Sequence, residues 1–136
     1  MNWVVDTCVV LDVFGNDPEF GLRSAKLLER KWKDGLEISP VTFVELAPSF
    51  DGDLEEQKRF LNQAGIQFPG GWNIEDTETA HEAWNRHIRE RRSGSLPKRP
   101  IADLLIGAFA VKRRGLITRN PNDFRRNFPG MEIVEP

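Results

Sequence analysis

The stretch "NWVVDT", residues 2–7, decides the expected fold. Its three consecutive apolar residues fit a short buried strand, and the Asp-Thr pair that closes it is typical of a helix start. A strand that passes directly into a helix is the first half of a strand–helix–strand unit, which favours a parallel sheet. Asp6 then lies at the carboxyl end of a strand, where open parallel sheets bind their ligands.

Further apolar segments continue this pattern along the chain. Because helical patterns rather than tight hairpins separate them, the sequence predicts an α/β fold with a short, mostly parallel central sheet flanked by helices. The length of 136 residues suits a single domain spanning residues 1–136. Strands are predicted over residues 2–5, 36–39, 115–118 and 131–134, and helices over residues 21–34, 41–50, 53–64, 76–92 and from about Pro100.

Composition limits the class of protein. Cys8 is the one cysteine, which excludes an internal disulfide or a multi-cysteine zinc site and suits a reducing cytoplasm. Among its valine neighbours it is interpreted as a small buried hydrophobe. The longest apolar run, residues 104–111, is far shorter than the roughly 20 residues of a membrane span, and no basic leader precedes the first strand. A cytoplasmic protein without a membrane segment is expected.

Charge is unevenly distributed although the formal net charge is only −2. The stretch "RHIRERRSGSLPKR", residues 86–99, holds six basic residues and one acidic residue. Taken alone, this pattern is typical of a solvated helix end whose cations complement the helix dipole.

Four acidic residues follow predicted strands or open predicted helices, and they are Asp6, Glu45, Asp103 and Asp123. Asp103 stands in the apolar run "RPIADLLIGAFA", residues 99–110, where an ionised carboxylate without a partner is unfavourable. If the four acids meet at one sheet edge, their repulsion requires a cation, and oxygen ligands suit Mg²⁺ or Mn²⁺. His81 and His87 are six residues apart on one predicted helix and point in different directions, which argues against a shared histidine site.

Each acid also has a purely structural interpretation. Asp6 can serve as a helix N-cap, and Glu45 can close a capping box with Thr42 in "TFVE". Asp103 can be a first-turn acid favoured by the helix dipole, and Asp123 can cap a short helical turn. These alternatives leave open a non-catalytic binding module.

Five stretches in order carry a family resemblance: "VVDTCVVLDVF", "ISPVTFVELAP", "IEDTETAHEAW", "IADLLIGAFA" and "LITRNPNDF". Together they resemble the PIN-domain family of metal-dependent ribonucleases, and within it the VapC-type toxins of toxin–antitoxin operons. The resemblance covers essentially the whole chain. It implies a three-layer α/β/α PIN-like fold and hydrolysis of RNA phosphodiester bonds with Mg²⁺ or Mn²⁺. The alternative within this family is an RNA-processing nuclease without a toxin role.

The resemblance also implies roles for individual residues. By position, Asp6, Glu45, Asp103 and Asp123 match the family's catalytic, metal-ligating acids. Asn120 stands where some members have an aspartate, while Thr7 and Thr118 match hydroxyls that support the carboxylates or a phosphate. The basic run then becomes a track for the RNA backbone, formed by Arg86, Arg89, Arg91, Arg92, Lys98 and Arg99.

Two protein partners follow from the same resemblance. VapC-type toxins resemble one another in pairing as homodimers and in being silenced by an antitoxin whose C-terminal segment lies across an apolar groove near the acids. We expect the helices over 41–50 and 53–64, with Phe43, Phe50 and Phe60, to line that groove or to fill the core. Trp72 and Trp84 are interpreted as core residues rather than base-stacking platforms.

Two other enzyme classes are excluded by the residues after the first strand. An aspartyl-phosphate phosphatase needs a second aspartate two residues after Asp6, and Cys8 occupies that position. A P-loop or dinucleotide site needs a glycine-rich turn, and "DTCVV" has no glycine.

Overall fold

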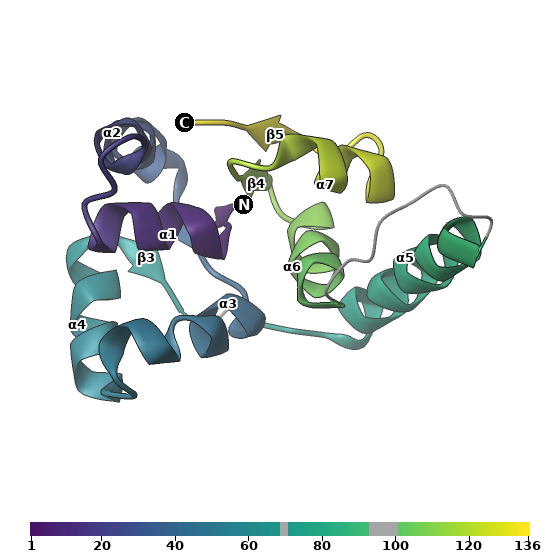
Figure 1. Ribbon diagram of the computed structural model, residues 1–136, viewed down its shortest axis with the longest axis horizontal. Coiled ribbons are helices and arrows are strands. Elements are labelled where there is room, and N and C mark those ends of the chain that lie inside the picture. Colours follow the sequence, from purple (N-terminus) through teal and green to yellow (C-terminus); the bar gives the residue numbers. More distant parts are fainter. Residues whose placement is uncertain (69–70, 93–100) are drawn as a thin grey trace.

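A parallel sheet forms the centre of the computed structural model, which describes residues 1–68, 71–92 and 101–136 (Figure 1). Its five described strands pair in the order β3-β2-β1-β4-β5, and every pairing is parallel. The α/β class and the parallel sheet are therefore confirmed. The strands are β1 (Trp3–Val5), β2 (Leu36–Glu37), β3 (Ile66–Gln67), β4 (Gly115–Ile117) and β5 (Ile133–Val134).

Helices join the strands, and two of the predicted helices end earlier than expected. The helix predicted over 21–34 changes to a 3-10 turn after Lys31 and ends at Gly35, whose φ of 94° suits only glycine well. The helix predicted over 41–50, with Pro48 at or near its end, breaks at Leu46, and Pro48 is the second residue of the 3-10 turn that follows. The helices are α1 (Thr7–Phe14), α2 (Gly21–Lys31), η1 (Trp32–Asp34), α3 (Pro40–Glu45), η2 (Ala47–Phe50), α4 (Leu54–Gln63), α5 (Ile74–Arg92), α6 (Ile101–Val111) and α7 (Pro121–Asn127).

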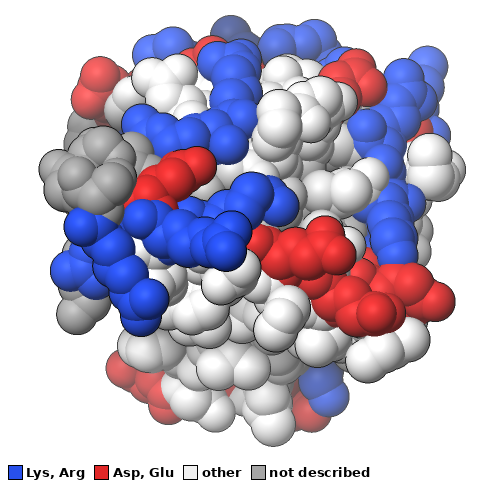
Figure 2. Space-filling model, turned by 90° about the vertical axis from the view of Figure 1, so that its right-hand side faces the viewer, with Lys and Arg blue, Asp and Glu red and all other residues white. Residues whose placement is uncertain are grey.

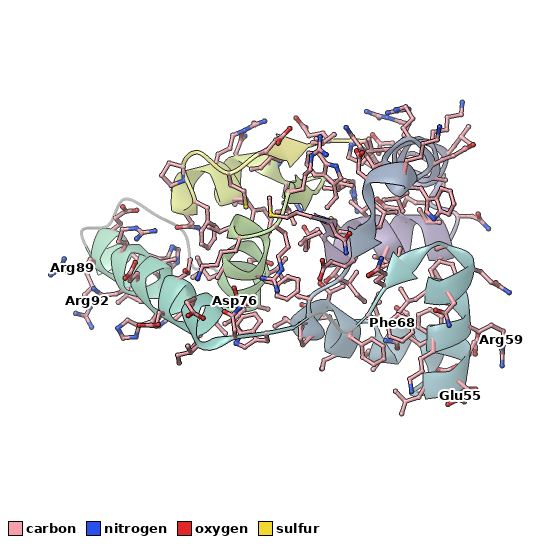
Figure 3. The ribbon with its side chains drawn as sticks, turned by 180° about the vertical axis from the view of Figure 1, so that it is seen from behind. Glu55, Arg59, Phe68, Asp76, Arg89 and Arg92 are labelled. Carbon is pink, nitrogen blue, oxygen red and sulfur yellow. The ribbon has the colours of Figure 1, made fainter. Side chains whose placement is uncertain are left out.

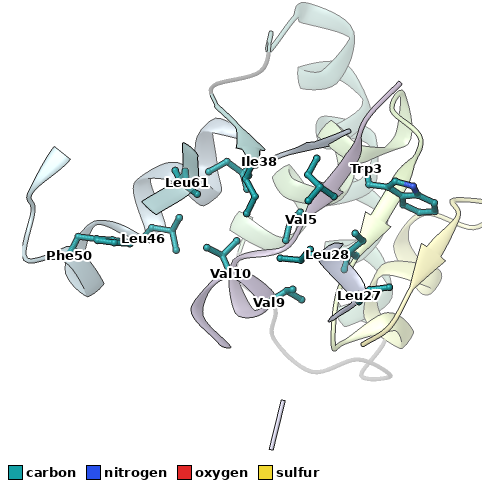
Figure 4. Close-up of a cluster of buried hydrophobic side chains, with 13 residues drawn as sticks. Trp3, Val5, Val9, Val10, Leu27, Leu28, Ile38, Leu46, Phe50 and Leu61 are labelled. Carbon is teal, nitrogen blue, oxygen red and sulfur yellow. The ribbon is translucent and has the colours of Figure 1, made fainter. Parts of the chain in front are cut away.

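The sheet separates two hydrophobic cores. Successive side chains of β1 point to opposite faces, so Trp3 and Val5 join one core while Val4 joins the other. The first core packs β1 against α1, α2 and α4, as the close-up of its side chains shows (Figure 4). The second core packs the opposite face against α5, α6 and α7, which Figure 1 shows on the other side of the molecule. This is the predicted three-layer arrangement.

Helix α6 is the central element of the second layer. Its middle residues, from Leu104 to Ala110 apart from the half-buried Leu105, are buried, as the run of apolar residues predicts. Gly107 lies so close to the Phe128 ring that any side chain at this position would overlap it. Within the described parts of the chain, no helix is long and apolar enough to cross a membrane.

The N-terminus of α5 is fixed against the end of α6. The buried Asp76 carboxylate forms an ion pair of 3.1 Å with Arg113 and accepts the backbone N–H of Asn73 at 3.2 Å. The Arg113 guanidinium lies 3.6 Å from the centre of the Phe109 ring, on which Trp72 also stacks at 5.9 Å. Trp72 thus packs against the core, as predicted, and these contacts hold the start of α5 beside the end of α6.

Candidate active site

Asp6 follows β1, the central strand, on either side of which the chain adds its other strands. From β1 the chain continues to β2 and β3 on one side, and it later adds β4 and β5 on the other. The edge outside the carboxyl ends of β1 and β4 is therefore the topological switch point, the usual ligand site of such sheets. Asp6 follows β1 and Thr118 follows β4, and the Thr118 hydroxyl donates a hydrogen bond of 2.7 Å to Asp6 Oδ2.

Further donors surround the Asp6 carboxylate. Its Oδ1 accepts the backbone N–H of Thr7 at 2.8 Å, which confirms the N-cap interpretation. Cys8 is half-buried and packs against the first hydrophobic core, as its interpretation as a small hydrophobe predicts, and its thiol also donates to Asp6 Oδ2 at 3.4 Å. Burial raises the pKa of Asp6, although the hydrogen bonds from Thr118, Cys8 and Thr7 and the charge of Arg119 lower it.

Glu45 reaches the same site from the end of α3. The Thr7 hydroxyl lies 2.7 Å from Glu45 Oε1, while the Thr7 N–H serves Asp6, so one threonine contacts both carboxylates. The capping-box alternative for Glu45 is wrong, because the N-cap of α3 is Ser39, whose hydroxyl accepts the backbone N–H of Thr42.

The segment after β4 completes this edge. Thr118 is buried, and its hydroxyl accepts the backbone N–H of Asn120 at 3.0 Å while it donates to Asp6. Asn120 is exposed at the N-cap position of α7, and its side chain makes no capping hydrogen bond. Between them, Arg119 Nε lies 2.8 Å from the buried Asp12 carboxylate, which ties this segment to α1.

Asp103 and Asp123 each lie in the first turn of a helix. Asp103 opens α6, which packs against α3 and β1, and the first-turn interpretation of this residue is confirmed. Asp103 is half-buried, so its carboxylate is more exposed to water than the apolar residues around it in the sequence suggested. Asp123 is also half-buried in α7, but Asn120 holds the N-cap position, so the capping interpretation of Asp123 is wrong.

The donor atoms suit a hard divalent cation. Asp6 and Glu45 meet at Thr7, and Mg²⁺ is commonly held by one or two carboxylates while it retains water and contacts substrate phosphates. A cation beside Asp6 would also stabilise the ionised carboxylate, which burial disfavours. Among residues 1–68, 71–92 and 101–136, no three acidic, histidine or cysteine side chains are arranged to hold a metal ion. Convergence of all four acids remains a prediction.

The basic residues of α5 lie on a different surface. Arg86, Arg89, Arg91 and Arg92 are exposed, and Arg89 and Arg92 extend from the far end of the helix in Figure 3. Figure 2 faces this end of the molecule and shows Lys and Arg side chains gathered beside a group of acidic ones. Arg86 also donates to the backbone oxygen of Asn127 at 2.8 Å. The predicted Lys98 and Arg99 lie outside the described residues.

The aromatic and histidine predictions can be placed as well. Trp84 is half-buried and stacks on His87 at 5.9 Å, whereas His81 is exposed, so the two histidines do not share a site. Phe50 is only 2% exposed and packs on Phe14 at 4.2 Å, so the prediction that it lines a groove is wrong and its core alternative holds.

Comparison with known proteins identifies the family of this fold. The family model of the PIN domain matches residues 3–127. The chain belongs to the PIN-domain family. PIN domains are generally nucleases, and divalent metal ions generally support their activity. No curated protein sequence was found to match this PIN domain.

Solved structures share this PIN-domain fold. One is the crystal structure of VapBC2 from Rickettsia felis bound to a DNA fragment from their promoter, with 17% identity, a TM-score of 0.69 and coverage of 99% of this chain and 98% of that one. Another is VapBC-1 from nontypeable Haemophilus influenzae, with 17% identity, a TM-score of 0.68 and the same coverage of both chains. At this identity, the likeness concerns the fold.

Sequence reasoning missed several polar side chains around the site. Thr42 was considered only as a possible cap and Ser39 only as the end of a predicted strand, although Thr42 is buried and contacts Thr7. Asp12 gave a signal that could have been used, because it is an acid within the apolar stretch "CVVLDVF" and therefore required a partner. That partner, Arg119, is more than a hundred residues away in the sequence.

The raised pKa of Asp6 makes the stability of the metal-free protein depend on pH. Because this pKa lies above its ordinary value of 3.8, the folded protein binds the proton more tightly than the unfolded chain does. The ionised carboxylate therefore lowers stability at neutral pH, and this penalty disappears as the pH falls through the folded pKa toward 3.8. We expect Asp6→Asn to raise the Tm in chelator at pH 7 and to have less effect at pH 4, as measured by calorimetry. Equal destabilisation at both pH values would contradict this account, and Glu55→Gln on the exposed face of α4 is the matched control.

Proposed function

We propose that this PIN-domain protein is an endoribonuclease that depends on Mg²⁺ or Mn²⁺ and acts as the toxin of a toxin–antitoxin pair. The observation that supports it most is the meeting of Asp6 and Glu45 on Thr7, at the switch point of the sheet. The fold shared with VapBC structures supports the toxin role. We further propose that residues 1–136 act as one nuclease domain in the cytoplasm, where Cys8 stays reduced.

The acids of this edge would hold the ion, with Asp6 and Glu45 as ligands and Asp103 and Asp123 as further ones. When bound, such an ion polarises a phosphate and lowers the pKa of a coordinated water. The protein holds the Asp6 carboxylate in place by two hydrogen bonds, from the Thr118 hydroxyl and from the Thr7 backbone N–H. These bonds orient the carboxylate oxygens toward one position.

Water, rather than a side chain, is the proposed nucleophile. Cys8 is the one thiol of the chain and lies beside Asp6, but burial and the Asp6 carboxylate raise its pKa to about 11. A thiol with this pKa is almost fully protonated at neutral pH, and the protonated form is a poor nucleophile. Covalent catalysis through Cys8 is therefore disfavoured.

The arginines of α5 are the proposed contacts to the RNA backbone. Arg89, Arg91 and Arg92 are exposed in the last turns of the helix, where their charges are available to phosphates. Arg86 is already bonded to the Asn127 carbonyl, so we assign it a smaller share of this role. Lys98 and Arg99 extend the proposed track along the sequence.

The nuclease proposal is tested by RNA cleavage with purified protein. We expect cleavage of total RNA in Mn²⁺ or Mg²⁺, its loss in EDTA, and at least a roughly 100-fold lower rate for Asp6→Asn or Asp103→Asn with an unchanged circular dichroism spectrum. Full cleavage in EDTA would contradict metal dependence. Glu55→Gln, remote from this edge on α4, should cleave like the wild type.

An apolar hollow on another face offers a site for the antitoxin. It has a volume of about 490 Å³ and lies between α1, α2 and the end of α4, and its apolar lining includes Val13, Ala25 and Leu28. Trp32, 60% exposed, forms one side, and Gly65 lies against its indole ring, where a side chain would overlap it. This hollow differs from the predicted groove of Phe43, Phe50 and Phe60. We propose that a segment of the antitoxin fills it.

A homodimer is the second partner that we propose. Val44 on α3 is 71% exposed, and burial against another copy would remove its side chain from water.

The hollow predicts a variant that separates partner binding from cleavage. We expect Ala25→Glu to weaken binding of the small protein encoded beside this chain at least tenfold after co-expression, because the new carboxylate would be buried among apolar groups. RNA cleavage should be unchanged. Lys26→Glu, its exposed neighbour on α2, adds an acidic residue outside the hollow and should bind normally. If Ala25→Glu and Lys26→Glu bind the partner protein equally well, the partner does not bind in the hollow.

A further inference from the structure

A row of hydroxyl groups leads from the interior to Glu45. Thr42 Oγ1 lies 2.9 Å from Thr7 Oγ1, and Thr7 Oγ1 lies 2.7 Å from Glu45 Oε1. Behind them, Ser39 Oγ lies 3.5 Å from Thr42 Oγ1. Two side chains of α3, Thr42 and Glu45, thus contact the first residue of α1, and the N-cap Ser39 contacts Thr42.

The directions of these hydrogen bonds follow from the number of protons. Each hydroxyl has one proton to donate, and an ionised carboxylate only accepts. Thr7 therefore donates to Glu45, which leaves its oxygen to accept from Thr42. Thr42 is 0% exposed, so its hydroxyl has no contact with bulk water that could replace this bond. The buried Thr42 hydroxyl therefore keeps the Thr7 hydroxyl pointing its proton at Glu45.

Glu45 requires such support because of its position. It is exposed at the last residue of α3, a helix of six residues, and a free glutamate side chain samples many rotamers. The bond from Thr7 holds Oε1 close to the Asp6 side of the site, because the N–H of the same threonine binds Asp6 Oδ1. Glu45 Oε2 is then left for a ligand.

The local sequence explains why Thr42 is available for this task. Threonine hydroxyls inside helices often bond to a carbonyl of the preceding turn. Thr42 is the third residue of α3, and its N–H is already used by the Ser39 cap, while its hydroxyl reaches across to α1. A valine at position 42 would fill the same volume but could donate no hydrogen bond to Thr7. Packing alone therefore does not require a threonine here.

We propose that Thr42 is a positioning residue, which acts through Thr7 to aim Glu45 at the divalent cation. This inference rests on the proposed function, because it assigns Glu45 to the ion. Thr42 itself touches neither the ion nor the RNA. Its effect is to fix the hydroxyl of Thr7, and supporting bonds of this kind commonly change metal affinity by about 10–100-fold.

The test is Mn²⁺ titration by calorimetry on chelator-stripped protein without RNA. We expect Thr42→Val to weaken Mn²⁺ binding about tenfold, and Thr42→Ser, which keeps the hydroxyl, to stay within about twofold of the wild type. In a Glu45→Ala background there is no carboxylate to aim, so Thr42→Val should cause no further loss. Wild-type affinity in Thr42→Val, or an equal loss in both backgrounds, would overturn the inference.

A second measurement in EDTA separates this inference from the proposed function. Thr42→Val should lower the urea midpoint of unfolding more when Glu45 is present than in the Glu45→Ala background, because the two residues are coupled through Thr7. If the wild type binds no Mn²⁺, the metal-dependent function fails, and this coupling still decides whether Thr42 orients Glu45. Additive midpoint shifts would show that it does not.

Discussion

The burial of the Asp6 carboxylate at the end of β1 is the constraint on which the site depends. Only 6% of this residue is exposed, and an isolated ionised carboxylate in such surroundings is strongly unfavourable. The chain meets this requirement with donors from different elements: the N–H of Thr7 on α1, the hydroxyl of Thr118 after β4 and the thiol of Cys8. The bond from Thr118 to Asp6 also joins the end of β4 to the end of β1. The contacts that stabilise the fold at this point are therefore also those that form the site.

Three surfaces with different chemistry surround this centre. The acidic edge is formed by the ends of β1, β4 and α3, the basic surface by the last turns of α5, and the apolar hollow by α1, α2 and α4. Figure 1 shows α1, α2 and α4 on one side of the sheet and α5 on the other. Because they belong to different elements, cleavage, RNA binding and partner binding can be altered separately by substitution.

Local patterns predicted the parts of the structure that short segments determine. The strand and helix at Asp6 were predictable because three apolar residues and an Asp-Thr cap suffice to define them, and the burial of α6 followed from its composition. Helix α7 was not predicted, because its seven residues show no clear periodicity. An end of the helix over 41–50 at or near Pro48 was predicted, because proline cannot continue a helix, whereas the 3-10 turn from Ala47 to Phe50 was not.

The contacts around the site depended on packing that the sequence does not display. Thr42 reaches Thr7 only because α3 packs beside α1, and Asp12 finds Arg119 only because α1 lies next to the segment after β4. Phe50 was assigned to a groove because aromatic spacing does not reveal which face of a helix is covered. The catalytic roles of Asp6 and Glu45 and the supporting hydroxyls of Thr7 and Thr118 were predicted from a family pattern, whereas the contacts of Thr42 and Ser39 behind them required the three-dimensional structure.

The central claim is that folding brings oxygen atoms of Asp6 and Glu45 together as ligands of one divalent ion. Anomalous diffraction from crystals soaked in Mn²⁺ tests it most directly. The account predicts a manganese peak within coordination distance, about 2.2 Å, of side-chain oxygens of both residues. Manganese bound only at other places, or contacting neither carboxylate, would contradict it.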